Sequence, residues 1–377
     1  MRNYQICNRC VMDTSDSLIK FDIDGVCDHC ITYDKDILPK WNYGKEKEDQ
    51  LNKIVSQIKK SSKNNDFDCI LGMSGGVDSS YLLHLVSKEL NLRPLVFHVD
   101  AGWNSQIAVN NIEKLVDGLG LDLYTEVINW EEMKDLQRAF FKSGVPHIDT
   151  PQDHAFFATM YKFASKYNIK NIITGGNFST ECIRNPKEWM YFQSDSTQLK
   201  DIHKKFGEAP LKTFPLTKVL WHKVYLPYFK GIKLHRLLDY MEYNKEKATD
   251  FLVNTYGYQR YPQKHFESRF TKFYESYWLP KRFGFDTRRV QFSSLILTKQ
   301  MSREEALKKL DTNGYDDENI QHEFEYVASK LDMTVSELHE CMRLPLKSFQ
   351  DYKSQDYMYE YGSKISRLLK LESGGKR

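Results

Sequence analysis

The segment ILGMSGGVDSSYLLHLV, residues 70–86, joins two apolar runs through a polar turn. Residues 67–73 predict a short buried strand, and the regular spacing of apolar residues over 78–90 predicts a helix. Two adjacent glycines at the end of a parallel strand direct backbone N–H groups and the positive end of the next helix toward an anion. The turn therefore predicts a phosphate site made of Ser74, Gly75, Gly76, Asp78, Ser79 and Ser80.

Asp78 is the unusual member of this turn, because a carboxylate repels a bare phosphate. It indicates either a bound magnesium ion or a helix cap. The segment lacks both the G-x-x-x-x-G-K-[ST] and the G-x-G-x-x-G pattern, so neither a Walker loop nor a dinucleotide fingerprint applies. An ordinary glycine turn is the alternative.

Further apolar runs alternate with helical patterns up to residue 176. We expect strands at 93–100, 121–128 and 169–176, with helices at 104–120 and 154–167. Strands that alternate with helices form a parallel sheet covered on both faces, which predicts an α/β fold.

Four of the seven cysteines lie in the first 30 residues, with the spacing C-x2-C-x16-C-x2-C. This spacing predicts a structural zinc site on Cys7, Cys10, Cys27 and Cys30, with a hairpin between the two pairs. A disulfide pair or a redox CxxC are the alternatives. Four thiolates leave no open position for a substrate.

The patterns divide the chain into four parts. These are a zinc-binding module at 1–40, a linker helix at 41–65, the α/β domain at 66–185, and a mostly helical substrate-binding subdomain at 186–377. Ser302-x-x-Glu305 and Thr334-x-x-Glu337 predict two capped helices in the last part.

Composition excludes several classes of protein. The chain has 377 residues, with 54 basic and 51 acidic side chains, so no overall field recruits nucleic acid or a membrane, and we expect neither as a partner. It has no apolar run of membrane-spanning length, and MRNYQICNRC has no signal-peptide core. We expect a cytoplasmic protein.

The sequence S-G-G-V-D-S-S after a strand resembles the pyrophosphate loop of the N-type ATP pyrophosphatases, which include GMP, NAD and asparagine synthetases and tRNA-thiolating enzymes. The resemblance implies cleavage of ATP between its α and β phosphates, transfer of AMP to a carbonyl oxygen, and displacement of AMP by a nucleophile. It also implies that Asp100, at the end of the second strand, contacts the nucleoside. At the end of the fourth strand, it implies an ATP site completed by Thr174, Gly175, Gly176, Asn177 and Glu181.

The remaining cysteines restrict the choice of nucleophile. A tRNA-thiolating enzyme needs sulfur-carrying cysteines, but Cys182 and Cys341 lie in no catalytic motif. A fused glutaminase needs an N-terminal cysteine, but Arg2 follows the first methionine. Ammonia would therefore come from a separate protein.

Residues 260–289 carry eight basic and three acidic side chains among many aromatics. This mixture fits an RNA surface, an anionic sugar site or a solvated face. Three rival functions stay open at this point, namely a sugar-modifying enzyme, a tRNA-modifying enzyme and a non-catalytic partner that docks through its zinc module.

A closer resemblance covers nearly the whole chain. CNRCVMDTSD, GVCDHC, SGGVDSS, TGGNFSTE, HFES and YWLPKRFGFDTRRVQFSSLILTKQMSREEAL are together similar to the N-acetyl sugar amidotransferases of the WbpG and PseA type. The resemblance implies conversion of an acetamido group to an acetamidino group on a nucleotide-linked uronic acid or a pseudaminic- or legionaminic-type acid. It implies ammonia from a HisH-like glutaminase, channelled by a HisF-like protein.

In that chemistry, the glycine loop would hold pyrophosphate and Asp78 would anchor Mg²⁺. His265 and Glu267 are candidate catalytic residues, as are Asp78 and Glu181; a surface histidine and a helix ion pair are the alternatives for the first two. Asp153 and His154 are weaker candidates. The sugar's anionic groups would be bound by Lys281, Arg282, Arg288 and Arg289.

Overall fold

The computed structural model describes residues 3–41, 44–315 and 318–368. Its centre is a parallel sheet in the order β3-β2-β1-β4-β5. The predicted α/β fold with a parallel sheet is confirmed. The strands are β1 Cys69–Gly72, β2 Pro94–Asp100, β3 Leu123–Val127, β4 Asn171–Ile173 and β5 Lys233–His235.

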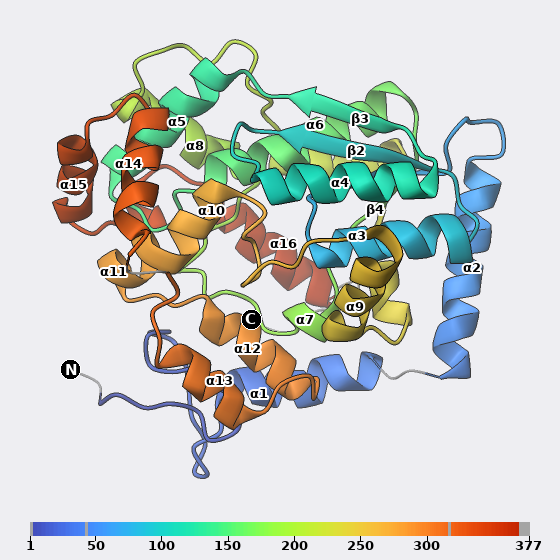
Figure 1. Ribbon diagram of the computed structural model, residues 1–377, viewed down its shortest axis with the longest axis horizontal. Helices are drawn as coiled ribbons and strands as arrows, with labels where there is room; N and C mark the ends of the chain where they lie inside the picture. The colour runs from blue at the N-terminus through green and yellow to red at the C-terminus, as the bar shows by residue number, and fades with distance from the viewer. Residues whose placement is uncertain (1–2, 42–43, 316–317, 369–377) are drawn as a thin grey trace.

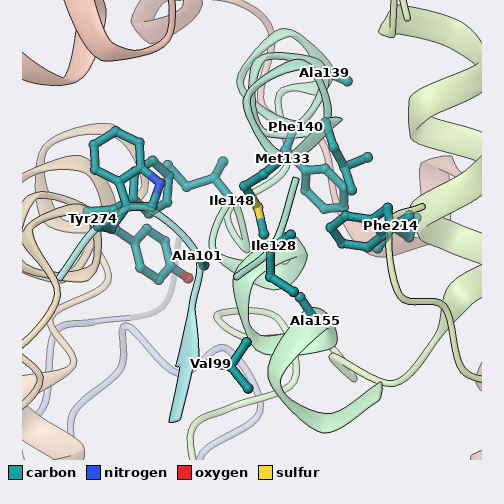
Figure 2. Packing of buried hydrophobic residues seen from close by; sticks show 14 of the residues in the cluster. Val99, Ala101, Ile128, Met133, Ala139, Phe140, Ile148, Ala155, Phe214 and Tyr274 are labelled. Carbon is teal, nitrogen blue, oxygen red and sulfur yellow. The ribbon is translucent and has the colours of Figure 1, made fainter. Parts of the chain in front are cut away.

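The two faces of the sheet bury alternate residues, as a pleated strand requires. Ile70 in β1 packs with α5 (Trp130–Ser143) and α6 (Thr150–Lys166), and Figure 2 shows residues of this cluster. Its neighbour Leu71 packs on the opposite face with α3 (Val77–His84) and α4 (Gln106–Leu119). The alternation fixes the register of β1, so the loop that follows it projects from the sheet's carboxyl edge.

The sheet extends beyond residue 185, where the α/β pattern was expected to end. Lys233 N donates to Lys170 O at 2.7 Å, and β5 pairs with β4 along its three residues. A three-residue edge strand is too short to show a period in the sequence. The following helix α9 (Lys245–Tyr256) also packs on α3, so this part of the chain belongs to the α/β layer.

The rest of the second half is helical, as Figure 1 shows. Thr334 and Glu337 make the complete reciprocal cap, and Ser302 accepts from Glu305 N at 3.0 Å. No helix in the described residues is long and apolar enough to cross a membrane. The remaining main helices are α1 Asp28–Thr32, α2 Lys45–Ser61, α7 Phe178–Glu181, α8 Ser196–Phe206, α10 Arg269–Phe273, α11 Leu279–Phe283, α12 Arg288–Leu297, α13 Arg303–Leu310, α14 Ile320–Lys330, α15 Val335–Arg343 and α16 Asp356–Leu368. Residues 369–377 of the expected subdomain lie outside the described residues.

Candidate active site

The glycine-rich turn leaves β1 and starts α3 at Val77. Gly75 has φ +83°, a conformation that glycine adopts without strain, and a Cβ there would lie 3.0 Å from Ala108 O. Ser79 Oγ donates to Gly76 O at 3.1 Å, and Ser74 Oγ lies 3.1 Å from Ser79 Oγ. The turn is therefore shaped by its own residues, with the start of α3 directed at the space above it. Ser80 Oγ is buried and has no hydrogen-bond partner among the described residues.

The end of β4 lies against this turn. A Cβ at Gly175 would be 3.0 Å from Ser79 N, so only glycine permits this approach. Asn177 is fully buried and caps α7 by accepting from Thr180 N at 2.9 Å. Thr174, Gly175 and Gly176 line a cavity of about 1130 Å³ that begins at the glycine-rich turn. Asp100 lies elsewhere: its carboxylate accepts from Gly102 N at 2.7 Å, and it is not among the residues that line the cavity.

Lys264 lies close to two carboxylates at the turn. Its Nζ lies 2.6 Å from Glu181 Oε1 and 3.6 Å from Asp78 Oδ2. Burial raises the pKa of Glu181, but the charge and hydrogen bond of Lys264 together with the charges of His265 and Arg236 outweigh it, and the pKa is lowered. Asp78 also accepts from the hydroxyl of Tyr243. Sequence patterns did not identify Lys264 or Tyr243, because neither belongs to the turn; the neighbouring HFES motif was the only local signal.

The HFES segment is brought to the turn by backbone pairing. Ser105 N donates to Glu267 O at 2.8 Å, and Arg269 N donates to Trp103 O at 2.9 Å, so the segment lies along the loop after β2. A Cβ at Gly76 would lie only 2.6 Å from Glu267 Oε1. Glu267 therefore stands directly beside the glycine-rich turn.

His265, next to Lys264 in the chain, begins a polar wall of the same cavity. Its Nδ1 lies 2.9 Å from Glu275 Oε1, and its φ of +67° is uncommon for a residue other than glycine. Burial lowers the pKa of His265, but the ion pair with Glu275 outweighs this and raises it to about 9. Its side chain is 38% exposed, so solvent moderates this shift.

Two aspartates continue the wall. Asp149 accepts from Thr271 Oγ1 at 2.7 Å, and Asp153 accepts from Gln193 Nε2 at 2.9 Å. Burial raises the pKa of both carboxyls, that of Asp153 to about 6. His154 faces away, since its ring is held by Gln193 O at 2.7 Å and by Thr217 N at 3.1 Å.

The structure separates the four basic residues that the sequence assigned to substrate. Arg288 lines the cavity, but its guanidinium pairs with Asp286 and donates to Thr312 O at 2.8 Å. Arg282 is buried and donates to Leu344 O at 2.9 Å. Lys281 lies over the ring of Tyr315, and Arg289 pairs with Asp13 at 3.0 Å. Lys281, Arg282 and Arg289 are thus not in the cavity lining, because helical spacing sends them to different sides of α11 and α12.

The four N-terminal cysteines form one buried cluster. Sulfur atoms lie 3.8 Å apart for Cys7 and Cys30, 3.6 Å for Cys10 and Cys27, and 3.7 Å for Cys27 and Cys30. A tetrahedral zinc with four thiolates separates its sulfurs by about 3.8 Å. Backbone N–H groups of Cys10 and Cys27 donate to the sulfur of Cys7. The cluster is consistent with the expected zinc ribbon.

The cysteine module is fastened to the second half of the chain. Arg303 donates to Cys7 O at 2.8 Å and to Cys10 O at 3.0 Å, and Val11 N donates to Ser293 Oγ at 3.1 Å. Figure 1 shows this blue segment beside α12 and α13. Arg289 also donates to Val11 O at 2.9 Å and so holds the module in place. Its sequence context did not indicate this role.

Two models of protein families match separate segments of the chain. Residues 68–240 match the model of the phosphoadenosine phosphosulfate reductase domain, a PP-loop superfamily domain, and residues 267–366 match that of the "LPS biosynthesis protein WbpG-like, C-terminal domain". No match to a curated protein was found.

Two solved structures also show similarity. NMN synthetase from Francisella tularensis is 18% identical over 59% of this chain and 90% of that chain, with a TM-score of 0.29. NH3-dependent NAD synthetase from Campylobacter jejuni is 14% identical over 58% of this chain and 98% of that chain, with a TM-score of 0.29. At these scores neither structure supports a functional argument.

Proposed function

We propose that this chain is an ATP-dependent sugar amidotransferase of bacterial surface-glycan synthesis, because its residues 68–240 match a PP-loop superfamily domain and residues 267–366 match a WbpG-like C-terminal domain. The carbonyl oxygen of a sugar acetamido group attacks the α-phosphorus of ATP, and pyrophosphate leaves. Ammonia then attacks the resulting imidate carbon and loses a proton, and AMP departs with the former carbonyl oxygen. The product is an acetamidino group.

One observation carries this proposal. A single cavity extends from the glycine-rich turn to His265, Glu275 and Gln291, so the PP-loop domain and the segment at the start of the WbpG-like domain line the same space. An ATP α-phosphate at the turn and an acetamido group beside the polar wall would therefore lie in one cavity. Adenylation requires this proximity.

The residues near the turn suit a nucleotide with its metal ion. Asp78 and Glu181 offer carboxylate oxygens, the ligands that Mg²⁺ prefers, and Lys264 lies between them. A bound Mg²⁺ would neutralise charge on the pyrophosphate leaving group. Lys264 supplies a positive charge at the same place, and the backbone N–H groups of the turn bind phosphate oxygens.

The polar wall suits a sugar. Carboxylates and amides accept and donate hydrogen bonds to hydroxyl and acetamido groups, and Asp149, Asp153, Gln152 and Gln193 supply both kinds. Phe156 and Phe157 provide apolar surface beside them. An acidic group of the sugar or its nucleotide would be bound by other cations that line the cavity. These include Arg184, Lys245 and Lys309, and also Arg236 and Arg260, which pair with acidic side chains in this structure.

Ammonia is proposed to come from a HisH-like glutaminase through a HisF-like protein. All seven cysteines are buried, so none is placed as a glutaminase nucleophile. The same burial disfavours the tRNA-thiolating alternative, since burial raises the pKa of Cys182 to about 12 and that of Cys341 to about 11.

The test supplies ATP, Mg²⁺, ammonia at high pH and a nucleotide-linked diacetamido uronic acid or a nonulosonic acid. We expect AMP, pyrophosphate and a product in which NH replaces one carbonyl oxygen, detected by mass spectrometry. With glutamine instead of ammonia, turnover should need the glutaminase partner. Formation of ADP, or AMP release that depends on tRNA rather than on a sugar, would overturn the proposal.

A further inference from the structure

An exposed apolar surface lies far from the cysteine module, on the π-helix η4 (Trp221–Phe229) and the edge strand β5. Tyr228 and Phe229 are 72% and 75% exposed, and Tyr225 stacks on Phe229 with ring centroids 5.8 Å apart. We call this surface the η4 face. Its members are Leu220, Val224, Tyr225, Tyr228, Phe229 and Leu234.

The opposite side of η4 is already buried. Leu226 is fully buried, and His222 stacks on Tyr161 of α6 with ring centroids 5.8 Å apart. A helix that is apolar on all sides is typically covered on all sides. The η4 face is therefore an apolar surface suited to a contact outside the described residues.

The charged side chains along the chain segment that carries the η4 face have one sign. Lys218, Lys223, Lys230 and Lys233 are exposed beside it. The sequence contains no aspartate or glutamate from residue 209 to residue 238, although the chain as a whole has nearly as many acidic as basic residues. A positive field thus surrounds the aromatic side chains, and it complements an anionic surface.

We propose that the η4 face binds the headgroup region of an anionic lipid bilayer, with its aromatic side chains inserted and its lysines beside the lipid phosphates. Aromatic and aliphatic side chains mixed with lysines are typical of interfacial membrane contacts. Lysine is depleted in protein–protein interfaces, which disfavours a protein as the occupant. This proposal does not depend on the catalytic function.

Vesicle flotation tests it with the full-length protein. Binding to vesicles of phosphatidylglycerol and phosphatidylcholine is expected, with little binding to phosphatidylcholine alone. The variant Tyr228→Ser/Phe229→Ser should bind at least about tenfold more weakly. The control Ile23→Ser removes an apolar side chain that is 99% exposed elsewhere, and it should bind as the original chain does.

The charge contribution is tested by Lys230→Gln/Lys233→Gln, which should lower binding by about tenfold or more. The matched control Lys59→Gln/Lys60→Gln changes two exposed lysines on α2 and should have little effect. Circular dichroism verifies that each variant is folded. Equal binding to both kinds of vesicle, or equal effects of the variants and their controls, would overturn the proposal. So would a dimer that protects Tyr228 and Phe229 from solvent.

Discussion

The cysteine cluster takes its four sulfur atoms from residues 7 to 30, whereas the glycine-rich turn is completed from distant parts of the chain. Tyr243 reaches Asp78 across 165 residues, and Tyr258 donates to Gly75 O at 2.9 Å across 183 residues. The first site is closed by its own residues, and the second is open to a cavity. A short motif can therefore specify a whole metal site but only part of an active site.

Removing a cysteine should have the largest effect. In Cys27→Ser we expect loss of bound zinc and a marked fall in thermal stability, because structural zinc supplies much of the folding free energy of such modules. Elemental analysis and calorimetry measure both. The control Cys182→Ala changes a buried thiol in the same apolar cluster, and it should keep its zinc. Equal zinc contents in the two variants would contradict the assignment.

Asp78→Asn should lower ATP cleavage by about 10²- to 10³-fold while the zinc content stays unchanged. The amide can still accept from Tyr243, so the fold should persist, but the anionic ligand is lost. AMP production measures the effect. Asp117→Asn on α4 changes an exposed carboxylate and should leave the rate unchanged.

Lys264→Gln and Lys281→Gln compare a lysine that the fold places at the turn with one that the sequence assigned to substrate. The first should lower turnover by about 10- to 100-fold, because it removes the charge between Asp78 and Glu181. The second should change turnover less than about twofold, because exposed surface substitutions seldom matter. The reverse order would show that the four-residue basic set, not the cavity, holds the substrate.

The His265–Glu275 pair should make stability depend on pH in a defined window. The folded pKa of His265 is raised from 6.5 to about 9, so the pair stabilises the fold fully below pH 6.5 and loses its effect as pH rises through 9. The melting temperatures of the original chain and of His265→Gln should therefore differ at pH 6 and converge above pH 9. Two parallel curves would exclude this ion pair as the cause.

The smallest effect is expected at a purely local motif. Thr334→Ala removes one side of the reciprocal cap with Glu337 and should cost about 1 kcal/mol, because the Glu337 N–H in the first helical turn loses its acceptor. Hydrogen exchange along α15 measures it. Catalytic turnover should not change, since the cap lies outside the cavity lining.

Sequence patterns predicted those features whose parts are neighbours in the chain. Residues only a few positions apart make up the strand–turn–helix at 67–90 and the cap at Thr334. The four-cysteine site consists of two such pairs. Backbone hydrogen bonding, the helical period and metal geometry act over these short distances, so the spacing of residues in the sequence is enough to predict these features.

Tertiary structure decided which distant side chains meet. The three-residue strand β5 has no period to detect, and it joins the sheet only because β4 offers a free edge. Lys264 and Glu267 reach the turn through the pairing of the 265–269 segment with the loop after β2, whereas Tyr243 reaches it from the segment before α9. Arg282 and Arg289 look like ligands for an anion in sequence, but packing commits them to carbonyl oxygens and to Asp13. The reason is physical: a charged side chain near the interior bonds to whichever partner the fold places beside it, and the linear sequence does not encode that distance.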